Sequence, residues 1–286
     1  MPTYIRSVLL LILLALILLP SAACAAIDTV KWDGLSDKDV SPDGRAALSM
    51  NAGNWKHAET SHFVYHYTDE KEAETVYINA EVYYRWVKDI FGITEDKWSK
   101  KNHIFIFTDK EKWDVFKTRV GSDGEFAAFT TGWELYIYRD PHWIKPRISL
   151  AHEIAHIILF RFLDGPIPLF LNEGFAEFLS YRAIAMQMEK SEFDLRTVRL
   201  VEKNDFIPLG ELVKMDTYPK DRIGTFYRES ELLTRFFILY NDSNKYYTLL
   251  RSVSNGKPFG KAAGEIYSYD MGTLETKFKS FATTGK

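Results

Sequence analysis

Hydrophobic residues in the first half of the chain recur with two different periods. Apolar side chains at helical spacing predict helices at 70–90 and 110–120. Short runs rich in aromatic and β-branched residues predict strands at 63–67 and 104–108. The alternation of the two patterns predicts an α+β fold that contains a small mixed sheet.

The second half is predicted to be mainly helical after one hairpin. Two strand-like runs, 126–130 and 134–138, flank Thr131-Gly132-Trp133, which is typical of a hairpin. The clearest helical patterns of the C-terminal part lie at 230–240, 244–253 and 273–281. We therefore expect a sheet lobe, then a central pair of helices, then a helical lobe, with a cleft between the lobes.

The first 60 residues divide into two segments. Residues 1–26 carry Arg6, an apolar run at 8–19 and then small residues, which together predict a secretory signal peptide. The apolar run is shorter than the roughly twenty residues that span a bilayer. Residues 27–60 show little periodicity and are expected to form an N-terminal extension with one helix turn near 45–51. Residues 61–286 then form the main domain.

The predicted signal peptide places the protein outside the cytoplasm, in the periplasm, in the cell envelope or secreted. Two alternatives attach the chain to a membrane: an uncleaved N-terminal anchor, or a lipid on Cys24. Ser21 stands where a lipoprotein signal usually has leucine, which weakens the second alternative. We expect a mature chain that begins between Cys24 and Ile27, and N-terminal sequencing would test this.

Composition narrows the class of partner. The net charge is −3, and no basic patch of the kind that binds nucleic acid is evident in the sequence. Cys24 is the only cysteine, so no internal disulfide forms. At 286 residues the chain is long enough to bury a sizeable core, in one domain or in two lobes.

The strongest candidate for a reactive site is the segment His152-Glu153-Ile154-Ala155-His156. Residues four apart share one face of a helix, so both imidazoles can bind a single zinc ion. Glu153 lies on the neighbouring edge, where it can take a proton from a zinc-bound water. The surrounding residues are strongly apolar, and inward polar groups on a buried helix are costly without a partner such as a metal. The motif therefore predicts a zinc site.

A third metal ligand is expected from a second helix. Gly165, Pro166 and Pro168 should end the first helix, and a helix at about 172–188 then returns beside the histidines. Glu173, in the first turn of that helix, is the predicted third ligand. The alternative is that Glu173 only complements the positive end of the helix dipole.

Glu177 follows one helical turn after Glu173. It lies too far along the helix to bind the same ion, but it can accept a hydrogen bond from the free ring nitrogen of His152. Such a contact fixes the tautomer of a metal ligand. The alternative is a solvated carboxylate.

His62 and His66 have the same spacing as the two motif histidines. They fall in a predicted strand, however, where four residues span about 13 Å. We therefore interpret them as structural or surface groups.

The segment Asn172-Glu173-Gly174-Phe175-Ala176-Glu177 resembles the N-E-G-x-A-E segment of the gluzincin metallopeptidases, especially the bacterial peptidase MA-like proteins. Weaker resemblance extends to 61–67, 207–212 and 226–230, and so to most of the chain from about residue 55. The resemblance implies a thermolysin-like zincin catalytic fold, a zinc cofactor and peptide-bond hydrolysis for residues 61–286.

Carried over residue by residue, the resemblance makes His152, His156 and Glu173 zinc ligands and Glu153 the general base. It also implies that a sheet edge, at 126–130 or 134–138, binds extended peptide through its backbone. The alternative is that these runs are ordinary sheet strands.

Tyr227 is the predicted donor to the oxyanion of the reaction, because its segment resembles the family's Y-x-x-S pattern. The chain has sixteen tyrosines, so a packing role is the alternative, and Arg228 is the second choice of donor.

Two features of related enzymes are absent from the sequence. The G-x-M-E-N segment of M1-type aminopeptidases is missing, and the most similar segment, 124–128, matches it poorly. This argues against aminopeptidase action. The third histidine and the methionine turn of the metzincins are missing as well.

The sequence thus predicts a zinc-dependent peptidase that acts on peptides or proteins outside the cytoplasm. One alternative is a scaffold protein that retains the zinc fold without catalysis. The intact Glu153 argues against it, because metal binding does not need this residue. Another alternative is a hydrolase of cell-wall peptides, and nothing in the sequence decides between the substrates.

Overall fold

A computed structural model describes residues 27–94, 100–122, 124, 126–139, 146–187, 200–239 and 243–285. The predicted signal peptide at 1–26, with Cys24, lies outside the described residues, and its cleavage and lipidation stay predictions. Within the described ranges, no helix combines the length and apolar character that crossing a membrane requires.

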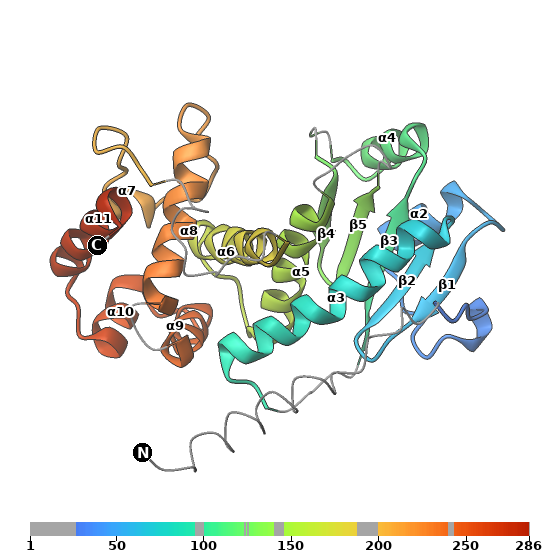
Figure 1. Ribbon diagram of the computed structural model, residues 1–286, viewed down its shortest axis with the longest axis horizontal. Coiled ribbons are helices and arrows are strands. Elements are labelled where there is room, and N and C mark those ends of the chain that lie inside the picture. Colours follow the sequence, from blue (N-terminus) through green and yellow to red (C-terminus); the bar gives the residue numbers. More distant parts are fainter. Residues whose placement is uncertain are drawn as a thin grey trace, which may run out of the picture.

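A five-stranded mixed sheet forms one side of the molecule (Figure 1). Its strands are β1 (Lys56–Glu59), β2 (Phe63–Tyr67), β3 (Asn102–Phe107), β4 (Ala128–Thr131) and β5 (Glu134–Tyr138). The spatial order is β1-β2-β3-β5-β4, with β2, β3 and β5 parallel and the two edge strands antiparallel to their neighbours. The prediction of an α+β fold with a small mixed sheet is confirmed.

The predicted hairpin is also confirmed, because β4 and β5 pair in antiparallel register. Gly132 in the turn has a φ of 59°, a left-handed conformation that glycine adopts without steric cost. Among the described strands β4 pairs only with β5, so its second edge has no neighbouring strand.

The two faces of the sheet are covered by different helices. Side chains alternate along β3, so that Ile104 and Ile106 point into the main core while Phe105 and Phe107 point the other way. The main core includes α3 (Glu70–Phe91), which begins at the capping residue Asp69 and ends at Gly92. The second face is covered by α4 (Lys110–Arg119) and α2 (Pro42–Met50).

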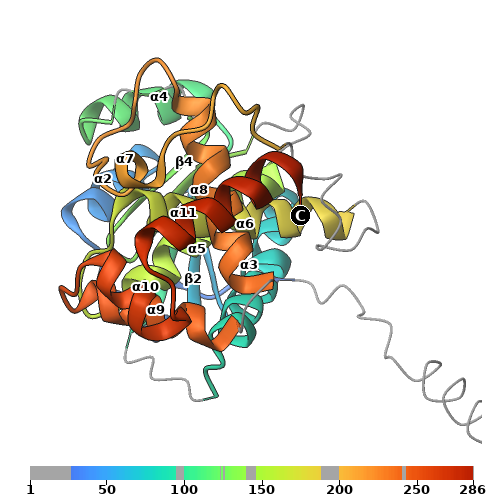
Figure 2. The ribbon, with the colours of Figure 1, turned by 90° about the vertical axis from the view of Figure 1, so that its left-hand side faces the viewer.

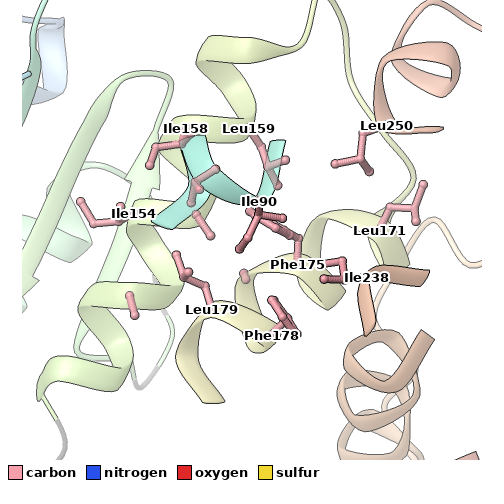
Figure 3. Packing of buried hydrophobic residues seen from close by; sticks show 14 of the residues in the cluster. Ile90, Ile154, Ile158, Leu159, Leu171, Phe175, Phe178, Leu179, Ile238 and Leu250 are labelled. Carbon is pink, nitrogen blue, oxygen red and sulfur yellow. The ribbon is translucent and has the colours of Figure 1, made fainter. Parts of the chain in front are cut away.

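Two central helices connect the sheet to the helical lobe. These are α5 (Pro146–Phe162) and α6 (Leu169–Gln187). Their apolar side chains meet those of α3, α8 and α9 in a continuous buried cluster, as Figure 3 shows for Ile154, Phe175 and Ile238. Burial of such side chains is the dominant favourable contribution to folding.

The helical lobe lies on the far side of α6 from the sheet (Figures 1 and 2). It consists of α7 (Leu209–Leu212), α8 (Ile223–Leu239), α9 (Ser243–Ser254), α10 (Phe259–Tyr267) and α11 (Met271–Thr284). Gly174 of α6 allows α8 to come very close, since a Cβ at this position would lie 2.2 Å from the Ser230 carbonyl oxygen. This contact draws the start of α8 toward Glu173.

Two helix starts differ from the sequence predictions. Helix α6 begins at Leu169 rather than at about 172, directly after Pro168, whose carbonyl accepts the amide protons of Leu171 and Asn172. Glu173 therefore lies in the second turn, away from the helix end. Helix α8 begins at Ile223, so Tyr227 lies inside it instead of opening it.

The expected N-terminal extension contributes to the sheet. Residues 27–60 contain α2 and β1, and β1 pairs with β2 along its whole length. Strand β1 (Lys-His-Ala-Glu) has no run of β-branched or aromatic residues, and so local sequence does not reveal it. The domain boundaries themselves stay predictions.

A buried chain of histidines joins the first three strands. His57 and His66 approach each other through their Nδ1 atoms at 2.8 Å, and His66 Nε2 lies 2.9 Å from His103 Nδ1. Burial lowers the pKa of all three rings, so they are neutral at pH 7. His66 is fully buried, which agrees with the structural role predicted for it.

Candidate metal centre

The turn between α5 and α6 brings the three predicted ligands together. His152 and His156 lie one helical turn apart on α5, with ring centroids separated by 4.7 Å. Glu173 Oε2 on α6 lies 3.3 Å from His152 Nε2 and 3.8 Å from His156 Nε2. One ligand atom from each of the three residues lies within 4.8 Å of the other two.

This geometry fits a small ion. Ligand atoms placed tetrahedrally at about 2.0–2.1 Å from zinc are about 3.3–3.4 Å apart. The distance of 3.3 Å from Glu173 Oε2 to His152 Nε2 matches this value, and the distance of 3.8 Å to His156 Nε2 is somewhat longer. Two nitrogens and one oxygen are also the donor types that zinc takes at catalytic sites, with a fourth position left open. The role of these residues as ligands stays a prediction.

The second nitrogen of each imidazole has its own partner. His152 Nδ1 lies 3.2 Å from Glu177 Oε1, the contact expected from the sequence, and His156 Nδ1 lies 3.1 Å from Asn172 Oδ1. Both oxygens accept, so each Nδ1 carries the proton, and in the neutral rings each Nε2 keeps its lone pair toward Glu173. Sequence analysis missed Asn172, although it stands directly before Glu173.

The charges of the cluster are strongly coupled. Burial lowers the pKa of His156 to about 4, with the charge of His152 acting in the same direction. Burial disfavours the charged form of His152 as well, but hydrogen bonds to Glu173 and Glu177 outweigh it and raise its pKa to about 10.

Glu153 faces the same space from α5. Burial raises the pKa of Glu153 to about 7. The charge of His152 and a hydrogen bond with Thr130 favour the carboxylate and lower this pKa, but burial has the larger effect. A carboxyl group whose pKa lies near 7 can both accept and return a proton at neutral pH. The contact with Thr130 places Glu153 beside strand β4.

Tyr218 is a site residue that sequence analysis missed. Its hydroxyl donates a hydrogen bond of 2.8 Å to Glu173 Oε1, so Oε2 is the oxygen that faces both histidines. Burial and the Glu173 carboxylate raise the pKa of Tyr218, so the phenol keeps its proton. Tyr218 lies in the segment between α7 and α8, 45 residues from Glu173, and no local motif marks it.

Tyr227 lies beside Tyr218, with the ring centroids 5.9 Å apart. Burial raises the pKa of Tyr227 to about 12, which keeps its hydroxyl protonated, as a hydrogen-bond donor requires. It lines the same cavity as His152, Glu153 and Glu173. Its predicted role as oxyanion donor stays a prediction.

We expect Tyr218→Phe to weaken zinc binding by about 10-fold, the lower end of the range for loss of a group that orients a metal ligand. The substitution removes only the hydroxyl that holds Glu173. A competition titration with a chromophoric chelator measures the affinity. Tyr269→Phe, a partly buried tyrosine that does not line the cavity, is the matched control. Equal zinc affinities for wild type and Tyr218→Phe would show that the hydrogen bond does not position Glu173.

A cavity of about 950 Å³ contains the metal-site cluster. Strand β4 and the β4–β5 turn line one side, α5 lines another, and residues 163–167 close the end beyond Leu159. Asn172, Glu173, Tyr218 and Tyr227 line the side of the helical lobe. The predicted cleft between the lobes therefore exists, and an edge strand borders it.

Comparison with known proteins finds no matching family profile and no matching curated protein. Among solved structures, the chain is similar to a mutant of an M1 zinc metallopeptidase from Deinococcus radiodurans, with 12% identity and a TM-score of 0.40. The match covers 80% of this chain and 52% of that protein, so this chain spans about half its length. This likeness is weak.

Proposed function

We propose that the protein is a zinc-dependent peptidase of the gluzincin type, with a thermolysin-like catalytic fold. The observation that carries the proposal is the convergence of His152, His156 and Glu173 on one point, with the partly buried Glu153 in the same cavity. A metal site alone would need no such carboxyl group. A site that activates water needs one within reach of the metal.

Each side chain has a distinct part in the proposed reaction. His152, His156 and Glu173 would hold the zinc, which when bound polarises the scissile carbonyl and makes water more acidic. Glu153 accepts the proton of the attacking water and then delivers it to the leaving amine nitrogen. Tyr227 donates a hydrogen bond to the oxygen that becomes negative. Glu177 and Asn172 keep the two imidazoles in the tautomer that the site requires.

Strand β4 is the proposed binding edge for the peptide backbone. Its second edge has no partner among the described strands, and Ala128, Phe129 and Thr130 line the cavity. An extended peptide that adds to this edge gains main-chain hydrogen bonds and passes beside Glu153. We further propose that the enzyme acts outside the cytoplasm, which rests on the pattern of residues 1–26 alone.

We expect the purified protein to bind one zinc ion per chain and to cleave members of a mixed peptide library. A chelator should abolish cleavage, because it removes the group that polarises the carbonyl, and added zinc should restore it. Mass spectrometry of a time course measures the products, and elemental analysis measures the metal. Absence of bound zinc contradicts the proposal. Full zinc occupancy with no cleavage would favour the scaffold alternative.

A further inference from the structure

The buried imidazoles of His57, His66 and His103, which we call the histidine ladder, run across three neighbouring strands. Each ring is joined to the next only through ring nitrogens, at 2.8 and 2.9 Å. His103 lies two residues before Phe105 on β3, so both point to the sheet face that α2 and α4 cover. The apolar side chains of α5 belong to the core on the opposite face. The ladder is therefore separate from the metal-site cluster.

The N-terminal segment, residues 27–47, covers the ladder. The Trp32 ring lies against the first two imidazoles, at centroid distances of 5.4 and 5.9 Å. The buried Nε2 of His103 has no hydrogen-bond partner among the described residues, and Asp37 Oδ1, at 3.8 Å, is the acceptor that faces it. The ladder is thus in contact with the N-terminal segment at both of its ends.

The two contacts between nitrogens limit how many protons the ladder holds. Each contact contains one proton, which one ring donates and the next accepts. In the neutral ladder the remaining proton lies on an outer nitrogen, and Asp37 favours Nε2 of His103. One added proton fits on the other outer nitrogen, Nε2 of His57, with both contacts kept. A second added proton sets two N–H groups against each other and breaks a contact.

The histidine ladder loses stability as the pH falls. Burial is the largest effect on all three rings and lowers the pKa of each. The folded ladder therefore binds fewer protons than free imidazoles do, so its contribution to stability is present above about pH 6.5 and is lost below it. The charged groups that face the ladder are Asp37 and Asp39 of the N-terminal segment, Glu134 of β5, and Lys100 and Arg161 beside Asp37.

Other contacts of the N-terminal segment do not respond to the same range of pH. Burial raises the pKa of Asp37, but amide hydrogen bonds from Asp39 and Lys101 outweigh it and lower the pKa below its ordinary value. Burial of Glu59 is likewise outweighed by hydrogen bonds from Ser36 and Lys101, which lower its pKa. Both carboxylates stay charged at pH 5 and above. A change between pH 7 and pH 5 therefore points to the imidazoles.

We propose that the histidine ladder is a pH-sensitive switch. It holds the N-terminal segment on the sheet at neutral pH and releases it in acid, when the three rings take up more than one added proton. The inference goes beyond the proposed peptidase function and does not depend on it, because no residue of the ladder lines the cavity of the metal site.

The test is hydrogen exchange of the purified protein at pH 7 and pH 5, followed by mass spectrometry and corrected for intrinsic exchange. Release frees three imidazoles with a pKa of about 6.5, whereas the closed ladder takes at most one proton, so opening of residues 27–47 should become about 10³–10⁴-fold more favourable at pH 5. Helix α11 should keep its protection. Unchanged protection of 27–47, or an equal loss in α11, would overturn the switch.

His66→Phe keeps an aromatic ring beside Phe105 but removes both nitrogen contacts. Residues 27–47 should exchange faster already at pH 7, and the further change at pH 5 should be at least about tenfold smaller than in wild type, because one ring fewer takes up a proton. His62→Gln is the matched control, since His62 bonds Glu81 and lies outside the ladder. It should respond as wild type does. A wild-type response in His66→Phe would overturn the assignment to the ladder.

A measurement on wild type covers the case in which His66→Phe does not fold. Nitrogen-15 spectra of the histidine-labelled protein report the tautomer of each ring. At pH 7 the proton should lie on Nδ1 of His57 and on Nε2 of both His66 and His103, the order that Asp37 imposes. Opposite tautomers, or three rings that titrate independently while 27–47 stays protected, would contradict the proposal.

Discussion

Glu153→Gln should lower the rate of peptide hydrolysis by about 10²–10⁴-fold, the range for loss of a general acid–base group. Glutamine keeps the size and hydrogen-bonding reach of the side chain but cannot take a proton from water. The fold and the zinc content should be unchanged, because the cluster of His152, His156 and Glu173 does not include Glu153. The measurement is kcat/KM on a peptide that wild type cleaves, with metal analysis of the same samples.

Glu111→Gln is the matched control, since Glu111 is an exposed carboxylate on α4 and lies outside the cavity. It should cleave at the wild-type rate. If Glu153→Gln cleaves as fast as wild type with full zinc occupancy, the assigned general base is wrong. If it loses zinc as well, Glu153 contributes to the metal site, and the loss of activity no longer identifies a proton carrier.

Glu173→Ala should weaken zinc binding by orders of magnitude, because it removes one of three protein ligands. The loss should exceed the about 10–100-fold typical of an outer group such as the Tyr218 hydroxyl. It should also leave His152 and His156 without the carboxylate that lies between their Nε2 atoms. Chelator competition measures the affinity, and replacement of His152 or His156 by alanine should have a similar effect.

Glu111→Ala should bind zinc as wild type does, which separates loss of a ligand from a general change in charge. Circular dichroism of each variant without metal shows whether the fold is retained. Wild-type zinc affinity in a folded Glu173→Ala protein would mean that the third ligand was chosen wrongly.

Local pattern was sufficient for the parts of the fold whose stability is largely local. Helix α3 has apolar residues at helical spacing and a capping aspartate, and the β4–β5 hairpin has glycine in its turn; both were predicted within a few residues. Strand β1 was missed, because its own composition does not favour a strand. It is specified by its pairing with β2 and by the bridge between Val30 and His57. The early start of α8 was missed for a related reason: its first turns carry no strong apolar repeat of their own.

In the candidate site, too, some features follow from local sequence and others depend on contacts between elements. Spacing along one helix places His152 and His156 together, with Glu153 beside them. Spacing along the next helix fixes the position of Glu177 relative to Glu173. Both follow from sequence because the geometry within a helix is regular. The resemblance to N-E-G-x-A-E pointed to Glu173. The Tyr218–Glu173 hydrogen bond and the Thr130–Glu153 contact were not foreseen.

The sequence by itself determined the local chemistry of this protein: two imidazoles on one helix face with a carboxyl group on the neighbouring edge, and the helix and strand patterns around them. Only the tertiary structure decided which carboxylate oxygen faces the histidines, which tyrosine holds it, and what surrounds the cavity. The physical reason is that these contacts join residues on different elements, such as Tyr218 and Glu173, 45 positions apart. Their distances are set by the packing of α5, α6 and α8 against one another and the sheet, which no local pattern encodes.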